Sequence, residues 1–312
     1  MARNWFDCMQ SGDFSAAWEI SDRALRDRAN VPCWHLPRHQ QYFWNGESPA
    51  GKRVLIRCYH GLGDTVQFIR YAPLLRRQAR EIIVWAQPSL VSLLDRTDGV
   101  DRVLPLHDGQ PETAYDLDVE VMELPHLFRS SLDDLPAGVP YLHSSPAATP
   151  PRSDDPTKFH VGLVWRAGDW DTRRSVPLPL LASLAEVPGV ALHALQRGST
   201  LADWRAEYGE NIGSDDVETT AAQMKSLDLI VSVDSFPAHL AGALGRPIWT
   251  LLHSTPDWRW MNTGSRSPWY PTMRLFRQAQ AGDWEAVVGQ VAAELRALTD
   301  RERPAQPPVA LG

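Results

Sequence analysis

The sequence predicts an α/β protein with two units, each organised around a parallel sheet. Short apolar runs alternate with helical patterns from Arg53 onward, and this alternation is typical of βαβ units. The stretch 146–157 interrupts the alternation with Pro, Ser and Asp and has no apolar periodicity, which is the composition of a linker. A chain of 312 residues also has the length for two domains.

These changes in pattern divide the chain into six segments. They are a helical, repeat-like N-terminal segment (1–50), a first α/β domain (51–145), the linker (146–157), a second α/β domain (158–282), a C-terminal helix (283–300) and a disordered tail (301–312). The first segment contains GDFSAAWEISDRAL, which has helical spacing and looks like one helix of a tetratricopeptide-type pair. A single such unit does not bury its own apolar face, so we expect it to pack on the part of the chain that comes after it.

The expected elements come in the order of two α/β units. In the first unit, strands are expected at 53–58, 81–86 and 101–106, with helices at about 65–79 and 90–95. In the second, strands are expected at 160–165, 190–196, 228–233 and 247–252, with helices at 178–187, 219–227, 237–244 and 282–298. Ligands of such sheets bind beyond the carboxyl ends of the strands, so the cleft between the two units is the expected site.

Composition excludes several classes of protein. The formal net charge of −7 argues against a general nucleic-acid binder. Cys8, Cys33 and Cys58 lack CxxC spacing, so we expect reduced, buried thiols, no metal site and a cytoplasmic protein. The chain has neither a signal-peptide core nor an apolar run long enough for a transmembrane segment. Association with a membrane surface stays open.

The first candidate site is the junction RCYHGLGDTVQF, where a strand meets a helix. Gly61 and Gly63 permit a tight turn and let another molecule approach the backbone. The free N–H groups at the helix start suit an anion or a sugar hydroxyl. Asp64 lies in the first turn, where a carboxylate is also simply favourable for the helix dipole. The adjacent His60 is read either as a second base or orienter of Asp64, or as a structural histidine.

The second candidate site is the junction VSVDSFPAHL. Asp234 and Ser235 stand at the N-cap position and precede Phe236 and a proline in the first helical turn. Ser235, His239 and the free N–H groups there suit a diphosphate. The alternative is an ordinary capped helix with a partly buried histidine.

Two loops add cationic and aromatic side chains. The loop WRAGDWDTRR supplies Arg166, Arg173 and Arg174, whose guanidinium forks match phosphate oxygens; a solvated charged loop is the alternative. The loop DWRWMNTGSRSPWYP is rich in Trp and Arg, and its aromatic faces suit bases and sugars. The alternative is a rigid cover over the sheet edge. We count Trp258 of this loop, with Gly61, Gly63 and Gln67, as candidate acceptor or loop contacts.

Taken in order, GLGDTVQFIRYAPLL, VGLVWRAG…RRSVPL, LHALQRG, DSFPAHLAGALGRP and SPWYPTMRLFRQ resemble the bacterial glycosyltransferase family 9 (heptosyltransferase-like) proteins. The resemblance covers roughly 50–298 and is nearest to the branch that follows tetratricopeptide repeats. It implies a GT-B fold, in which two Rossmann-like domains face a cleft. The first domain would bind the acceptor and the second a nucleotide sugar. The C-terminal helix would cross back to the first domain.

The resemblance also implies roles for individual residues. Asp64 matches a general base, and Asp234, Ser235 and His239 match a segment that meets the donor diphosphate. Arg173 or Arg174 would neutralise the leaving group, while Gln196 and Arg197 lie at a strand end near the nucleoside. Tyr59-His60 replaces a common Glu-Gln pair, which leaves the acceptor open, and the shortened arginine loop leaves open which arginine meets phosphate.

We therefore expect an inverting glycosyltransferase without a tightly bound cofactor or metal. Its donor would be a nucleotide sugar, ADP-heptose or a similar compound, and its acceptor a glycan, a protein or a small molecule. One alternative is a non-catalytic module of the same fold that binds a nucleotide sugar or a protein. A second is another GT-B-like enzyme, such as a nucleotide-sugar epimerase, although the sequence offers no distinctive acid–base pair for it.

Overall fold

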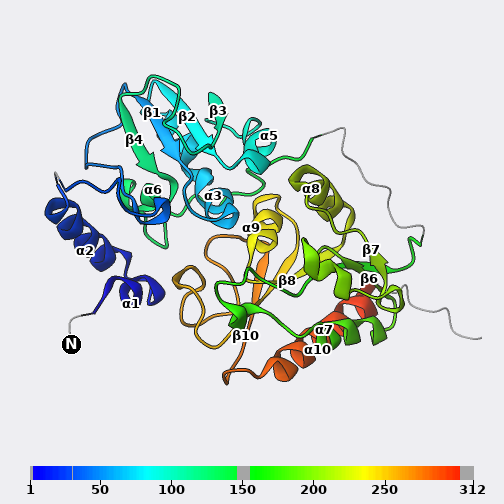
Figure 1. Ribbon diagram of the computed structural model, residues 1–312. Coiled ribbons are helices and arrows are strands. Elements are labelled where there is room, and N and C mark those ends of the chain that lie inside the picture. Colours follow the sequence, from blue (N-terminus) through cyan, green and yellow to red (C-terminus); the bar gives the residue numbers. More distant parts are fainter. Residues whose placement is uncertain (1–2, 30, 146–154, 303–312) are drawn as a thin grey trace, which may run out of the picture.

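The computed structural model describes residues 3–29, 31–145 and 155–302 (Figure 1). Most of the expected linker and residues 303–312 of the expected tail lie outside these ranges. The described chain forms two parallel sheets, one in each half of the sequence. Within these ranges, no helix combines the length and the apolar character needed to cross a membrane.

The first sheet has the order β3-β2-β1-β4, and its strands pair in parallel. Its strands are β1 (Arg53–Arg57), β2 (Glu81–Ala86), β3 (Arg102–Pro105) and β4 (Leu117–Glu120). The strand β4 was not expected, because its sequence LDVE is short and alternates with acidic residues. It pairs with β1, so the ends of β1 and β4 lie side by side.

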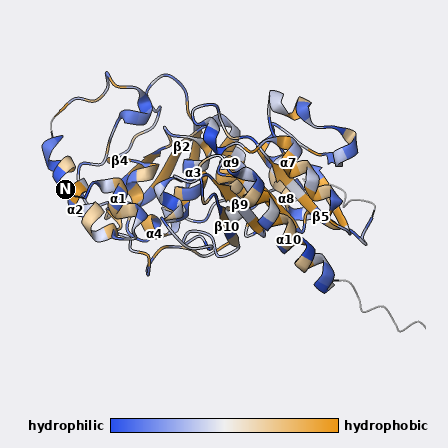
Figure 2. Cartoon of the chain, turned by 90° about the horizontal axis from the view of Figure 1, so that it is seen from below, coloured by the Kyte–Doolittle hydropathy of each residue, from blue (hydrophilic) through white to orange (hydrophobic). Residues whose placement is uncertain are grey.

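The second sheet has the order β10-β9-β8-β5-β6-β7 and is also parallel. Its strands are β5 (Phe159–Val164), β6 (Val190–Ala194), β7 (Glu210–Asn211), β8 (Leu229–Val233), β9 (Ile248–Leu252) and β10 (Met273–Arg277). The central strand β8 is buried along its whole length, as expected for a parallel strand that is covered on both faces. Figure 2 shows this apolar sheet between the helices of the second domain.

The α-helices are α1 (Trp5–Gln10), α2 (Phe14–Asp27), α3 (Leu62–Phe68), α4 (Ala72–Arg76), α5 (Val91–Leu94), α6 (Leu124–Leu127), α7 (Leu178–Ala182), α8 (Val217–Ser226), α9 (Phe236–Ala243) and α10 (Trp284–Glu302). Helices α3 to α9 lie in the connections between strands, whereas α1 and α2 precede β1 and α10 follows β10. The helix expected at about 65–79 is divided into α3 and α4 by a short 3₁₀ turn, and Pro73 stands in the first turn of α4. A proline is tolerated there because that N–H needs no partner within the helix.

The N-terminal segment is helical only in its first half. Helix α1 ends at Gln10 and α2 at Asp27, and among the described residues only the 3₁₀ turn Arg38–Gln40 follows before β1. Pro32, Pro37 and Pro49 account for this difference from the expectation, because proline and the residue before it disfavour helix.

The N-terminal helices contact both domains. On the first domain, Trp18 Nε1 donates to the Ser130 carbonyl at 2.8 Å. On the second, Gln10 Nε2 donates to the Pro256 carbonyl at 2.9 Å, and Trp5 packs edge-on against Trp258 at 5.4 Å between ring centroids. The helical start of the chain therefore links the two halves.

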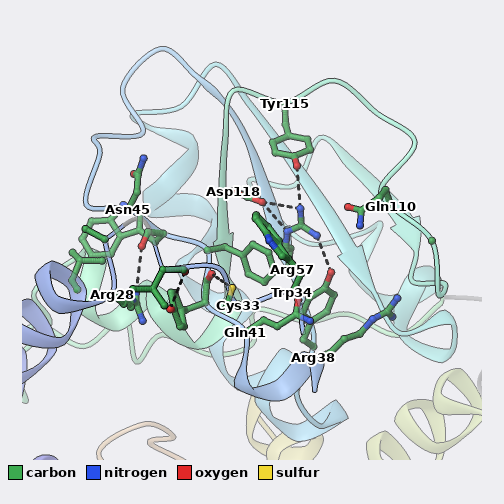
Figure 3. A pocket seen from close by; sticks show the side chains of 18 of the residues that line it. Arg28, Cys33, Trp34, Arg38, Gln41, Asn45, Arg57, Gln110, Tyr115 and Asp118 are labelled. Atoms are coloured by element: carbon green, nitrogen blue, oxygen red, sulfur yellow. Dashed lines mark hydrogen bonds and ion pairs between the residues drawn. The ribbon is translucent and has the colours of Figure 1, made fainter. Parts of the chain in front are cut away.

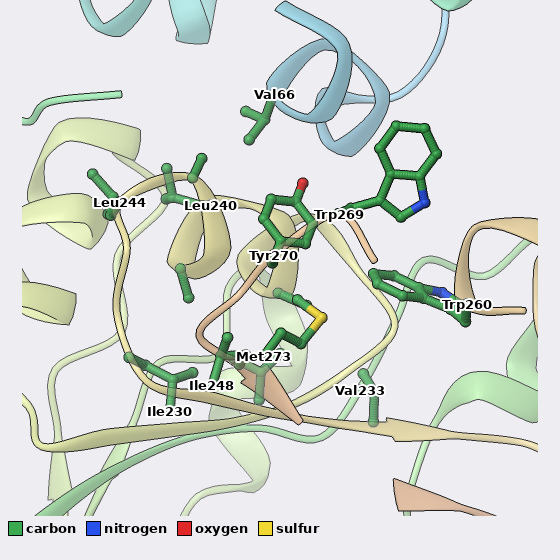
Figure 4. Close-up of a cluster of buried hydrophobic side chains, with 14 of the residues drawn as sticks. Val66, Ile230, Val233, Leu240, Leu244, Ile248, Trp260, Trp269, Tyr270 and Met273 are labelled. Carbon is green, nitrogen blue, oxygen red and sulfur yellow. The ribbon is translucent and has the colours of Figure 1, made fainter. Parts of the chain in front are cut away.

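Helix α10 packs against α7 and β10 of its own domain. Its apolar side is buried there, and Glu294 pairs with Arg274 of β10 at 2.7 Å. This position differs from the expected crossing to the first domain. Between the domains, helix α3 instead packs directly on α9. Figure 4 shows Val66 of α3 pointing toward the buried cluster that contains Leu240 and Tyr270.

Candidate functional site

The two strand-to-helix junctions singled out in the sequence meet at the α3–α9 contact. A Cβ atom on Gly63 would lie 2.8 Å from Cδ2 of His239, so only glycine lets the two helix starts come this close. We expected the glycines to admit another molecule. At Gly63 the group that approaches is the imidazole of the second domain.

Between these helix starts lies a cavity of about 240 Å³, which we term the central cavity. Asp64 and the two glycines line its first-domain side, and Arg174, Asp234, Ser235, Phe236 and His239 line its second-domain side. The predicted base and the predicted diphosphate-binding turn therefore share one space. Asp64 Oδ2 accepts a hydrogen bond from the Gly61 N–H at 2.9 Å, so this carboxylate also caps α3.

Arg259 crosses from the second domain to the first at this cavity. Its guanidinium pairs with Asp64 Oδ1 and donates to Gln67 Oε1 at 2.8 Å. A third bond, also of 2.8 Å, goes to Asp257 in its own turn. Burial alone would lower the pKa of Arg259, but Asp257 and Asp64 outweigh it and raise that pKa above its usual range. The sequence places Arg259 in the aromatic loop but indicates no such role for it.

Of the three arginines in the loop after β5, Arg174 is the one that lines the central cavity. It is 8% exposed, and Nη1 donates to the Asp234 carbonyl at 2.9 Å. Its Nε is buried and has no hydrogen-bond partner among the described residues. The exposed ring of Trp170 stacks on this guanidinium at 3.9 Å. A buried guanidinium with a free donor is suited to an incoming anion.

Burial and neighbouring charge also shift two titratable groups of the α9 start. Burial, with help from Asp257, raises the pKa of Asp234 to about 6. Burial and nearby arginines hold the pKa of His239 well below its ordinary value, so this imidazole is neutral at pH 7. Its Nδ1 lies 3.0 Å from the Tyr270 hydroxyl and its Nε2 lies 4.0 Å from Asp234 Oδ1.

A second cavity of about 410 Å³ adjoins the first, and we term it the adjoining cavity. It shares Ser235 and Phe236 with the central cavity and is also lined by Arg166, Gln196 and Arg197. Gln196 Oε1 accepts from the backbone N–H groups of Trp165 and Arg166 at 3.1 and 3.0 Å, which fixes the loop after β5. The guanidinium of Arg197 lies 5.2 Å from the centre of the Phe236 ring.

Four predicted residues lie outside both cavities. Arg173 projects to solvent and is paired with Asp171 at 2.9 Å. The Nδ1 of His60 lies 2.9 Å from the buried Glu120, and Gln67 is fully buried beneath Arg259. Trp258 is buried between Phe68 and Trp5. Trp258 therefore lies where the second domain meets α1 and the first domain.

Residues 211–283 match the family model described as glycosyltransferase family 9 (heptosyltransferase). The curated protein FlbA of Caulobacter vibrioides is 27% identical over 326 aligned positions, which include 91% of this chain. The chain spans only 53% of the length of that relative.

Several solved structures share the fold at low identity. A family 9 glycosyl transferase from Veillonella parvula has a TM-score of 0.62 and 12% identity, with 82% of this chain and 99% of that chain covered. The ADP-heptose lps heptosyltransferase II of E. coli has a TM-score of 0.58 and 17% identity, with 80% and 99% covered. E. coli heptosyltransferase WaaC, solved with ADP-2-deoxy-2-fluoro heptose, has a TM-score of 0.51 and 14% identity, with 80% and 100% covered. The fold is therefore of the GT-B type.

Proposed function

We propose that this chain is an inverting glycosyltransferase that transfers a sugar from a nucleotide diphosphate to an acceptor. One observation carries the proposal. Asp64 of the first domain lines the same cavity as Arg174 and the start of helix α9 of the second domain. This cavity continues into a second one of about 410 Å³, which has the size of a small-ligand site. ADP-heptose or a similar compound is our proposed donor, because ADP-heptose enzymes are among the proteins with this fold.

Asp64 is suited to act as the general base. Each carboxylate oxygen has two acceptor positions, and the bonds from Gly61 and Arg259 occupy one on each oxygen. An acceptor hydroxyl can therefore donate to Asp64 without displacing either partner. Asp64 takes the proton of this hydroxyl as its oxygen attacks the anomeric carbon from the face opposite the diphosphate. A positioned base contributes roughly 10²–10⁴-fold to the rate.

The second domain supplies donors for the departing diphosphate. The guanidinium of Arg174, which lines the central cavity, and the amides of the first turn of α9 supply cationic and dipolar groups for this site. When Tyr270 donates to Nδ1 of the neutral His239, the hydrogen of that ring is on Nε2, toward the cavity. His239 then stabilises the leaving group as a neutral hydrogen-bond donor.

The wider setting is also part of the proposal. The acceptor is a glycan, a protein or a small molecule, and the α1–α2 hairpin supports a place in the branch that follows tetratricopeptide repeats. Buried free thiols at Cys8, Cys33 and Cys58 fit a reducing cytoplasm.

The test combines binding and turnover. A thermal-shift screen with nucleoside diphosphates and their sugars identifies the donor, because a ligand of the folded state raises the melting temperature. Asp64→Asn should then lower transfer or donor hydrolysis by more than about a hundredfold while the donor still binds. Near-normal turnover in this variant removes Asp64 from the mechanism. Donor binding without any product from the wild-type protein favours the non-catalytic module.

A further inference from the structure

A third cavity, of about 670 Å³, lies on the first domain, and we term it the outer pocket (Figure 3). It shares no lining residue with the central or the adjoining cavity. Its walls are the segment 31–45 and the loop 108–115, and its floor is formed by Arg57 at the end of β1, Tyr59 just after it, and Asp118 within β4. Neither the proposed base nor the proposed donor site uses it.

The pocket exists because loops, not helices, cover this face of the first sheet. Leu55, Ile83 and Trp85 form a small apolar cluster of their own there. Partly buried side chains such as Tyr59 and Tyr115 pack against that cluster. Arg38 joins the two walls, since its guanidinium donates to the His107 carbonyl at 2.6 Å.

A nearly buried arginine organises the floor. Arg57 is 4% exposed, and its guanidinium lies 4.2 Å from the centre of the Phe43 ring. It donates to Asp118 Oδ2 at 2.9 Å, to the Tyr59 hydroxyl at 2.8 Å and to the Tyr115 hydroxyl at 3.0 Å. This arrangement fixes two phenols and a carboxylate in one place.

The same arrangement leaves hydrogen-bonding capacity free. Both phenol oxygens accept from Arg57, and among the described residues neither hydroxyl donates to a partner, so each can still donate. The Oδ1 atom of Asp118 is likewise without a partner in the described ranges, while Oδ2 accepts from Arg57. Free donors beside a free acceptor suit hydroxyl groups, because each hydroxyl both donates and accepts.

Charge and shape narrow the class of ligand further. The arginines that line the pocket are each paired with a carboxylate: Arg57 with Asp118, Arg28 with Glu123 and Arg38 with Asp108. Close carboxylates neutralise Arg57 and Arg28, and Arg38 lies 3.9 Å from the exposed Asp108 and donates to the His107 carbonyl, so the described lining does not favour an anionic ligand. Trp34 stands at the wall and is 76% exposed. A large exposed aromatic ring beside polar groups suits the apolar face of a sugar ring.

We propose that the outer pocket binds a neutral saccharide through Trp34 and the free groups of Tyr59, Tyr115 and Asp118. Tyr59 is two residues before Gly61 of the central cavity, so the natural occupant is a glycan part of the acceptor. That role rests on the proposed transferase function, whereas saccharide binding itself does not.

The test is saturation-transfer NMR on the full chain with glucose, galactose, mannose, N-acetylglucosamine, cellobiose, lactose and maltose. At least one of these sugars should give a signal without nucleotide present. Trp34→Ala should reduce its affinity at least tenfold, and Tyr115→Phe should reduce it severalfold. Phe6→Ala is the control: it removes another exposed aromatic side chain, of 42% exposure, which lines none of the three cavities. This control should leave saccharide affinity unchanged.

Three outcomes overturn the proposal. They are no signal from any of the sugars, a signal that survives Trp34→Ala, and a Trp34-dependent signal only from a neutral Ser/Gly/Thr hexapeptide. ADP binding is measured in parallel by thermal shift. If ADP fails to bind while a sugar still binds through Trp34, the donor site is wrong and the outer pocket stands.

Discussion

Arg259 of the second domain holds Asp64 of the first in an ion pair between residues 195 positions apart in the sequence. The pair is largely buried, with Asp64 at 25% and Arg259 at 9% side-chain exposure. Because Gln67 accepts from the same guanidinium, the arginine is fixed relative to α3. The position of the proposed base therefore depends on the contact between the two domains.

Replacement of this arginine should affect turnover more than donor binding. Arg259→Met removes the charge and the hydrogen bonds but retains an apolar side chain, so Asp64 loses the partner of Oδ1. Displacement of a catalytic group by about 1 Å can lower the rate about a hundredfold, and we expect a kcat reduced by roughly ten- to a hundredfold. Steady-state kinetics well below the melting temperature measure it.

The donor KM should stay within a few-fold, and Arg259→Lys should restore part of kcat and shift its pH profile toward the wild type. A folded Arg259→Met protein with unchanged kcat contradicts the positioning role. If the variant shows both a lower kcat and a much higher donor KM, the substitution has instead destabilised the interface between the domains as a whole.

The adjacent arginines Arg173 and Arg174 provide a matched pair. Arg174→Ala removes a buried donor that has no internal partner at Nε, and nucleoside diphosphate binding should weaken by about 1.5–3 kcal/mol. Arg173→Ala should change the affinity less than about twofold, because Arg173 is exposed and paired with Asp171. Isothermal titration calorimetry measures both. The opposite order of effects would assign the diphosphate to Arg173.

Donor affinity should depend on the ionisation of Asp234. Burial and Asp257 raise the pKa of this carboxyl to about 6, so it gains a negative charge as the pH rises through that value. The charge opposes an anionic diphosphate, and affinity for an ADP-sugar should fall between about pH 5 and 7. An ADP-sugar is the right probe because its diphosphate diester does not titrate in this interval.

Asp234→Asn should flatten this pH dependence if the side chain is its cause. The other ionisable groups near the cavity, among them Asp64, Asp257 and His239, remain in the variant. Any pH dependence of donor affinity that persists in the variant is therefore due to these groups. The prediction is wrong if wild type and Asp234→Asn lose affinity in parallel.

Gly63→Ala should destabilise the contact between the domains. The new Cβ would lie 2.8 Å from Cδ2 of His239. The His239 ring is held in place because it stacks on Trp260 and is hydrogen-bonded to the Tyr270 hydroxyl. Overpacking of this kind costs about 1–3 kcal/mol, which thermal or urea unfolding detects. Gly289→Ala in α10 is the control, since its Cβ meets nothing within 4 Å. The control should be neutral or stabilising by up to about 1 kcal/mol, and equal effects at the two positions would contradict the argument.

The sequence predicted the elements whose apolar residues are continuous. The strands β1, β2, β5, β8 and β9 lie within a residue of their expected bounds because both of their faces are buried. By contrast, β4 and β10 contain charged residues in LDVE and MRLFR, and their pairing is decided by neighbouring strands rather than by local pattern.

The sequence predicted the candidate site as two separate strand-to-helix turns, because each turn has its own local sequence signal. Asp64 and Ser235 stand at helix starts that strand-to-helix junctions mark plainly. The partnership of Asp64 with Arg259 has no local signal, because it is a contact between domains. Burial of Trp258 was missed for the same reason: its partners Trp5 and Phe68 come from distant segments.

The seating of α1 has a mechanical consequence for any work with this protein. Gln10 and Trp5 contact the turn at 256–260. This turn contains Arg259, whose guanidinium binds the carboxylate of Asp64. Residues 5–10 therefore support the position of the proposed base. Trimming them, or fusing a bulky tag against Trp5, would disturb chemistry far from the cut.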